Sequence, residues 1–200
     1  MQKIKLTKTE LKKQKDNLKR YNRYLPTLYI KKHQLQKEIE QVKSAVDEIE
    51  KKHYRLMREF DSWIALLGEE IGLEDLIRLE KIETRQDNIA GVDISVFVKA
   101  HIEVRSYDLF AYPLWVDSAI DIIFRLLHYR SEIVVLEFQE VCLSKELKVT
   151  AQRVNLFEKV KIPEAKEAIR LISIYLADQQ VAAVGWARMA KKKIQEAEVK

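Results

Sequence analysis

The sequence predicts a mainly α-helical protein in which the two ends pair as a long antiparallel two-helix coiled coil, joined by a short central head with a short helix and a β-hairpin. Three observations lead to this fold class. Apolar residues keep one heptad register through the first third of the chain, a second heptad pattern recurs near the C-terminus, and glycine (4) and proline (3) are scarce among 200 residues. We therefore expect an N-terminal shaft helix over 1–67, a head over 68–115 and a C-terminal shaft helix over 116–200.

The N-terminal heptad pattern starts at Ile4 and steps alternately by three and four residues, and we call these positions the N-terminal seam. Seam positions that repeat every 3.5 residues indicate a helix that supercoils with a partner helix. Pro26 lies within this helix and predicts a kink, because proline removes a backbone donor and clashes with the preceding turn. The seam comprises Ile4, Thr7, Leu11, Gln14, Leu18, Tyr21, Leu25, Leu28, Lys32, Leu35, Ile39, Val42, Val46, Ile49, His53, Leu56, Phe60, Trp63 and Leu67.

The head begins where Gly68 and Gly72 end the regular periodicity, and Pro113 closes it. Its pattern predicts a short helix over 73–85 and two short β-branched strands, over 92–98 and 102–105. Two isolated strands are marginally stable, so we expect them to pack on a helix or on a partner protein. The apolar strand residues expected to bind a partner are Val92, Ile94, Val96, Ile102 and Val104.

The last segment is expected to be helical over 115–197 except at Pro163. Two antiparallel helices of equal rise that leave the head near residues 67 and 117 place Pro26 opposite residue 159 and Ile4 near Val181. Residues after Val181 should therefore continue as a single, unpaired helix. The C-terminal seam comprises Ala165, Ile169, Ile172, Leu176, Gln179, Ala183, Trp186 and Ala190.

The sequence contains no catalytic constellation, so we expect no catalytic, cofactor-binding or metal-binding residues and no enzymatic activity. There is no glycine-rich phosphate loop, and Glu50 and His53 have the Glu-x-x-His spacing of di-iron bundles without a second copy. His53 on the seam is better explained as a register-setting residue. The single Cys142 fits a reducing compartment. The sequence has no run of about 18 apolar residues, so it predicts no membrane span. We expect a cytoplasmic protein.

The net charge of +5 is concentrated near the N-terminus, where basic residues outnumber acidic ones. Three interpretations of this basic end remain open: a solvated helix face, a nucleic-acid or anionic surface site, and a shaft end seated in a complementary protein socket.

Residues 153–163, with Arg153, Asn155, Ile162 and Pro163 at its fixed positions, resemble the R-x-N…I-P signature of the D subunit of the V-type and A-type ATPases. Residues 6–11 and 28–35 look like the first helix of that family, and residues 88–92 are similar to its N-I-x-G-V element. The resemblance covers nearly the whole chain.

The resemblance implies a central rotor axle that couples ATP hydrolysis or synthesis in a ring of catalytic A and B subunits to ion transport through a membrane rotor. It implies a non-catalytic subunit, peripheral to the membrane, that binds no nucleotide or nucleic acid itself. The head would dock the F subunit and the cap of the membrane rotor. The C-terminal tip would turn within the ring as a bearing, through Ala183, Trp186, Arg188, Met189 and Lys191. A passive coiled-coil tether and a nucleic-acid-binding helical hairpin are the alternatives.

Overall fold

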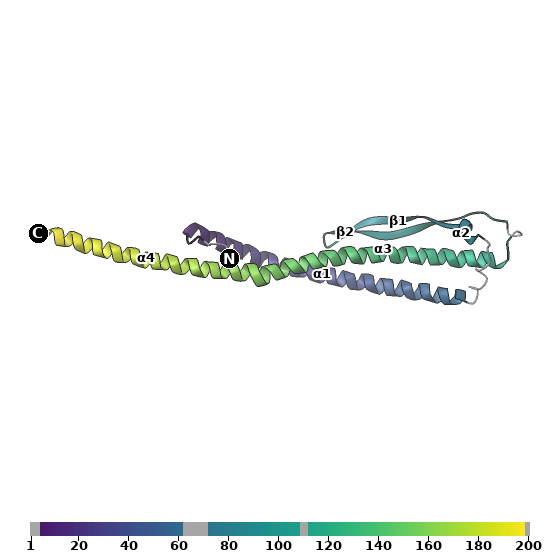
Figure 1. Ribbon diagram of the computed structural model, residues 1–200, viewed down its shortest axis with the longest axis horizontal. Helices are drawn as coiled ribbons and strands as arrows, with labels where there is room; N and C mark the ends of the chain where they lie inside the picture. The colour runs from purple at the N-terminus through teal and green to yellow at the C-terminus, as the bar shows by residue number, and fades with distance from the viewer. Residues whose placement is uncertain (1–4, 62–71, 109–111, 199–200) are drawn as a thin grey trace. The chain divides into compact units, whose positions relative to one another are not determined.

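The computed structural model describes residues 5–61, 72–108 and 112–198, apart from the side chains of residues 60, 61, 74, 75 and 198. In chain order its elements are α1 (Lys8–Asp61), α2 (Leu73–Leu76), β1 (Ile77–Ile89), β2 (Val92–Val104), α3 (Trp115–Leu156), the π-helical turn η2 (Phe157–Lys161) and α4 (Ile162–Glu198) (Figure 1). They form two compact units. One combines residues up to Ile30 with those from Thr150 onward, and the other is Lys31–Val149.

The helix α1 begins with a side-chain cap. The backbone N–H of Glu10 donates a hydrogen bond to Oγ1 of Thr7 at 3.3 Å, which satisfies one of the free donors of the first turn. From Leu11 to Leu56, every position of the N-terminal seam is buried or half-buried. The prediction of a long helix that packs along one heptad face is therefore confirmed. The helix continues through Pro26, and the predicted residues 62–67 lie outside the described range.

The predicted short helix over 73–85 is wrong beyond its first turn. Only Leu73–Leu76 is helical, and Ile77–Ile89 forms the strand β1, which pairs antiparallel with β2. The segment is rich in Glu, Lys and Arg, which favour helices, but pairing with a β-branched neighbour overrides that local preference. The two short strands predicted over 92–98 and 102–105 are one continuous strand, Val92–Val104.

The hairpin turn consists of Ala90 and Gly91, which have φ of 52° and 75°. Two successive positive φ angles match the twist of the flanking strands in a two-residue turn. The register shifts between Leu79 and Lys81 and between Glu83 and Thr84. The second shift leaves Val98 of β2 without a paired residue, and such bulges increase the twist of a ribbon and re-aim a side chain. Val98 is 53% exposed.

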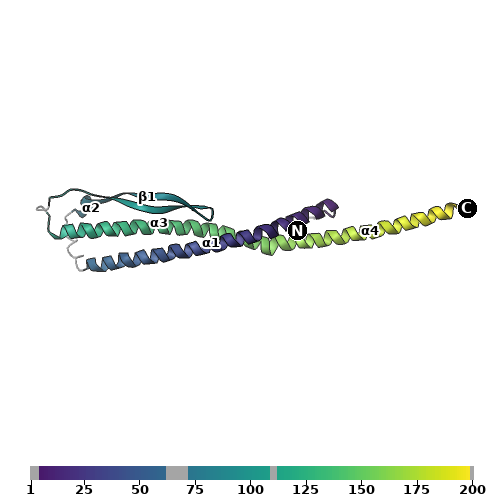
Figure 2. The ribbon, with the colours of Figure 1, turned by 180° about the vertical axis from the view of Figure 1, so that it is seen from behind.

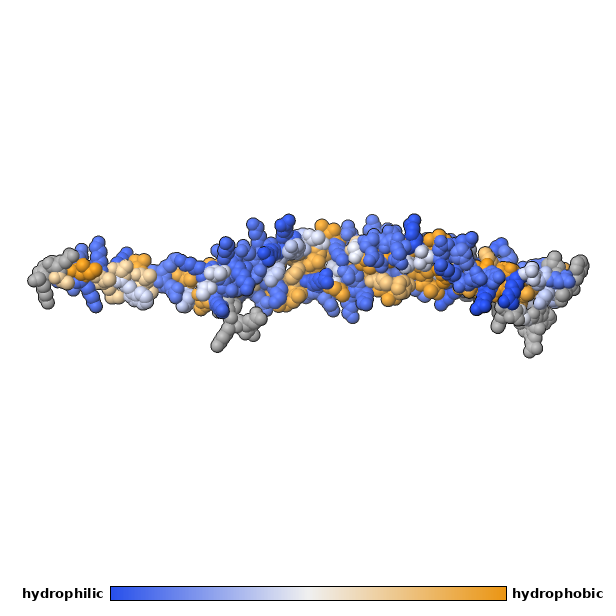
Figure 3. Space-filling model, turned by 90° about the horizontal axis from the view of Figure 1, so that it is seen from above, coloured by the Kyte–Doolittle hydropathy of each residue, from blue (hydrophilic) through white to orange (hydrophobic). Residues whose placement is uncertain are grey.

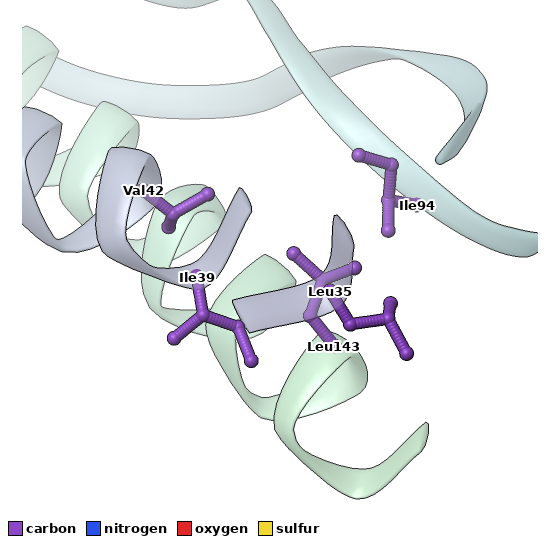
Figure 4. Close-up of a cluster of buried hydrophobic side chains, with 5 residues drawn as sticks. All are labelled: Leu35, Ile39, Val42, Ile94 and Leu143. Atoms are coloured by element: carbon purple, nitrogen blue, oxygen red, sulfur yellow. The ribbon is translucent and has the colours of Figure 1, made fainter. Parts of the chain in front are cut away.

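Within the unit Lys31–Val149, the hairpin lies alongside α3 in both views (Figures 1 and 2). Its apolar face closes a core with both long helices. Figure 4 shows Ile94 of β2, Leu35, Ile39 and Val42 of α1, and Leu143 of α3 in this cluster. Nε2 of the buried Gln139 on α3 donates a hydrogen bond to the backbone oxygen of Ser95 at 2.6 Å, which fixes the height of β2 on the helix. The hairpin is therefore a third layer on the coiled coil.

A second apolar cluster lies at the other end of the hairpin. Leu76 and Ile77 are buried there against Val116 and Ile120 of α3. The hydroxyl of Tyr107 donates a hydrogen bond to the carboxylate of Asp117, and the backbone N–H of Arg105 donates to the carbonyl of Leu76. The connection from β2 to α3 is therefore bonded to Leu76 through Arg105 and to α3 through Tyr107.

The other unit pairs the first part of α1 with η2 and α4. Tyr21 stacks on Phe157 with 5.3 Å between ring centroids, and Tyr29 donates a hydrogen bond to Glu158 at 2.7 Å. These contacts lie close to the predicted level at which Pro26 faces residue 159. The expected helix break at Pro163 is wrong: the chain remains helical through the π-helical turn that precedes the proline. Ile4 lies outside the described residues, so its predicted pairing with Val181 stays a prediction.

Truncation of Ile94 should destabilise the unit Lys31–Val149. Ile94 is 2% exposed and belongs to the cluster that joins the hairpin to both helices, so Ile94→Ala should lower the free energy of unfolding by about 2–4 kcal/mol. Val98→Ala, on the same strand but half in solvent, should cost less than about 1 kcal/mol. Chemical denaturation of both variants measures the difference. Equal losses would mean that Ile94 does not hold the hairpin on the helices.

Candidate interaction surfaces

Glu50 and His53 are the residues of the described chain at which the sequence raised a metal site. Among those residues, no three His, Cys, Asp or Glu side chains are grouped to hold a metal ion. Glu50 and His53 border an open groove of about 540 Å³ between α1 and α3, together with Lys51, Tyr54 and Arg130. Cations and carboxylates are mixed along this groove, and His53 is half-buried on the seam. No acid–base pair converges with supporting partners among the residues that line it.

The five head residues predicted to bind a partner are mostly used by the protein itself. Ile94 is buried, and Val92 and Val96 pack against the same cluster. Ile102 packs against the second cluster. Val104 is 41% exposed. The surface that the hairpin leaves open to a partner therefore lies at Val104 and at two residues that sequence reasoning did not single out, Val98 and Leu79.

A second surface missed by sequence reasoning runs along α3. Val134, Phe138 and Val141 are 42%, 58% and 65% exposed. Their spacing of four and three residues places them on one helix face, and we call them the α3 stripe. They differ from the residues that face α1 and the hairpin, such as Leu143 and Gln139. The same spacing was visible in the sequence, but several faces of this segment are apolar, so the pattern alone did not separate the open face from the packed ones.

The opposite end of the head presents Leu114, which is 92% exposed. It precedes the half-buried Trp115 at the start of α3, and the ring of Tyr112 stands edge-on to that of Tyr107. An apolar side chain this exposed, beside an aromatic cluster, marks a site that a partner can cover.

The tip residues Ala183, Trp186, Arg188, Met189 and Lys191 all lie on α4 and are exposed. Every described residue from position 177 to 197 is exposed, and in both ribbon views α4 continues past the N-terminal end of α1. Trp186 is 68% exposed, and Figure 3 shows apolar side chains along this part of α4, at the left of the view. The residues of the R-x-N…I-P signature lie elsewhere: Arg153 and Asn155 are exposed near the end of α3, and Ile162 and Pro163 begin α4.

Two ion pairs fix the level of α1 against α3 in the unit Lys31–Val149. Nζ of Lys31 lies 2.7 Å from Oε1 of Glu146, and Nζ of Lys43 lies 3.4 Å from Oε1 of Glu140. The first pair is the less exposed of the two, and it lies near the hairpin turn, with the Lys31 ammonium 3.9 Å from where a Cβ on Gly91 would stand. The residue number rises from Lys31 to Lys43 along α1 while it falls from Glu146 to Glu140 along α3, as an antiparallel arrangement requires.

Residues 10–192 match the family model described as the ATP synthase D subunit. The chain belongs to the ATP synthase D subunit family. It is 42% identical over 194 residues to the D subunit of the V-type ATP synthase from Borreliella burgdorferi, covering 97% of this chain and 96% of that one. It is 36% identical to the corresponding V-type ATP synthase protein of Chlamydia caviae and 33% identical to that of Chlamydia abortus, each covering 96% of this chain and 94% of the relative.

As a member of this family, the protein is a central-stalk subunit of a V/A-type rotary ATPase, and its role is coupling within that complex. Stalk subunits of this family are generally non-catalytic. Among residues 5–61, 72–108 and 112–198, no helix combines the length and the apolar character that a membrane span requires. Family membership favours the axle over a passive tether or a nucleic-acid binder.

Proposed function

We propose that this chain turns inside the ring of catalytic A and B subunits, with the tip of α4 as a bearing and the head as the docking platform for the F subunit and the membrane-rotor cap. The observation that carries the proposal is the division of apolar surface. The two clusters of the head bury their own residues, whereas the tip, the α3 stripe and Leu114 leave large apolar side chains in solvent.

The tip suits a bearing because its small side chains would keep each contact with the ring weak. Ala182, Ala183, Ala187 and Ala190 keep one part of the helix slim, and a Cβ added to Gly185 would meet no other group within 4 Å. A rotating part must break at each step every contact that it makes, so no orientation can be held by a large free energy. The exposed basic residues Arg188 and Lys191 would be complementary to acidic groups on the ring.

The α3 stripe and the exposed hairpin residues would hold the F subunit, and Leu114 would face the cap of the membrane rotor. The stripe lies on the helix that the hairpin packs against. Deleting the hairpin would be a poor test, because it would also uncover Leu35 and Leu143. Point substitutions at exposed positions leave the core intact.

We expect the double substitution Phe138→Asp and Val141→Asp to weaken binding of the F subunit at least about tenfold, because both side chains are more than half exposed and would be desolvated by the partner. Ser118→Asp, an exposed position on another face of the same helix, is the matched control and should bind the F subunit normally. Binding is measured by titration of the purified F subunit against the full chain. Unchanged binding in the double variant, together with loss of binding in Leu114→Asp, would place the F subunit at the other end of the head.

A further inference from the structure

The π-helical turn η2 interrupts a run that is otherwise α-helical from Trp115 to Glu198. A π-turn bonds residue i to i+5 and so contains one residue more than an α-turn. Pro163 lies two residues after it. In an α-helix the ring of Pro163 would clash with the carbonyl of residue 159, four positions earlier, and the wider turn relieves that clash.

One buried series shifts by one residue across η2, whereas Val154 and Ala168, both buried, keep a spacing of two heptads. Upstream, the fully buried Leu143 and Thr150 and the half-buried Phe157 follow one another at intervals of seven. The next position in this series is Glu164, which is exposed, and Ala165 is buried in its place. The shift persists one heptad later, where Leu171 is 43% exposed and Ile172 is fully buried.

The partner helix contains no such shift. On α1, Tyr21, Leu28 and Leu35 remain seven residues apart, and all are buried or half-buried. One helix of the coiled coil therefore contains an extra residue that the other helix lacks. The shift in the series that ends at Phe157 and the π-helical backbone fall at the same turn.

Side chains of α1 contact the turn from both sides of Pro26. Tyr21 stacks on Phe157 at an interplanar angle of 27°, and the Tyr29 hydroxyl donates to Glu158. This hydrogen bond raises the pKa of Tyr29 above its usual value. Phe157 and Glu158 both belong to η2, so α1 contacts the turn that contains the extra residue.

We propose that η2 is a joint that sets the rotation of α4 about its own axis. The turn contains one extra residue, Pro163 fixes its position, and as a result Ala165, Ala168 and Ile172 face α1. Loss of that residue, or its movement along the helix, would rotate the distal part of α4 by roughly 100°, the angle per residue of an α-helix. The consequence for the bearing surface at the tip rests on the proposed axle function; the joint itself does not.

Three variants of the full chain test the joint. Pro163→Ala alone removes the proline that fixes the position of the turn. Deletion of Lys159 together with Pro163→Ala also removes the extra residue. Deletion of Lys19 together with Pro163→Ala is the matched control, because Lys19 is likewise an exposed lysine but lies on α1, where no residue is spare. Thermal unfolding and amide hydrogen exchange are measured for each.

The Lys159 deletion should unfold at or above the temperature of Pro163→Ala, because the series that ends at Phe157 then continues through Ala165 and Ile172 in one heptad register. The Lys19 deletion should unfold roughly 10 °C lower, since it turns the half-buried Leu11 and Leu18 out of the N-terminal seam. Within residues 150–172 of the natural chain, fast exchange should be confined to amides near residues 157–163. It should spread along the helix in Pro163→Ala and disappear in the Lys159 deletion.

Equal losses of thermal stability in the two deletions would overturn the proposal. Slow, uniform exchange across residues 150–172 of the natural chain would also overturn it, and this measurement requires no variant to fold. Both readouts use the isolated chain, so they test the joint separately from the axle function. The joint can be disproved while the axle function holds, and the axle function can be disproved while the joint holds.

Discussion

Leu35→Asp should abolish the packing of the unit Lys31–Val149. Leu35 is fully buried where α1, α3 and the hairpin meet, beside Ile94 and Leu143. A carboxylate there would have no partner, and an unpaired buried charge costs several kcal/mol, on the order of the whole stability of many domains. We expect loss of at least about 4 kcal/mol in chemical denaturation, with exposure of apolar surface to a hydrophobic dye.

Gln36→Asp is the matched control for this substitution. Gln36 is the next residue on the same helix and is exposed, so the same change of charge should alter stability by less than about 0.5 kcal/mol. Similar losses in both variants would show that helix propensity or net charge, rather than burial against the hairpin, determines the outcome.

Removal of residues 186–200 should reduce coupling between ATP hydrolysis and ion transport while hydrolysis by the ring remains measurable. Residues 186–197 are all exposed on α4, so the rest of the chain should fold normally. Trp186 and Met189 are the large apolar side chains that the ring would shelter, and their loss weakens the bearing. The measurement is ion transport per ATP hydrolysed in reconstituted complexes.

Two outcomes separate a bearing from a switch. The paired substitution Trp186→Ala and Met189→Ala should give a smaller defect in the same direction, because the slim helix remains in place. Complete loss of hydrolysis in a truncated complex that still assembles would show that the tip makes an essential activating contact, and the bearing would be the wrong description.

The long helices could be predicted because their signal is repeated. Each seam residue carries little information, but the register from Leu11 to Leu56 leaves one consistent buried face, and the structure buries it. The same periodicity predicted that Ala165 and Ile172 face inward. The equal-rise argument predicted the level of Pro26, since Tyr29 contacts Glu158 close to the expected position.

The strand β1 could not be predicted because its structure depends on a distant partner. Residues such as Glu80, Lys81 and Glu83 favour a helix locally, and only pairing with β2 makes this segment extended. The turn at Ala90 is also unusual, since a residue with a Cβ adopts positive φ there. The α3 stripe was missed for a related reason: an open apolar face becomes recognisable only after the packed faces are known.

Direct observation of rotation is the measurement that tests the axle most directly. A probe would be attached through Arg85→Cys, an exposed position on β1, in a Cys142→Ser background, with the catalytic ring of the assembled complex fixed to a surface. The axle function predicts that the probe turns in one direction when Mg-ATP is added and stops when ATP is exhausted. Sustained ATP hydrolysis with a stationary probe would contradict it.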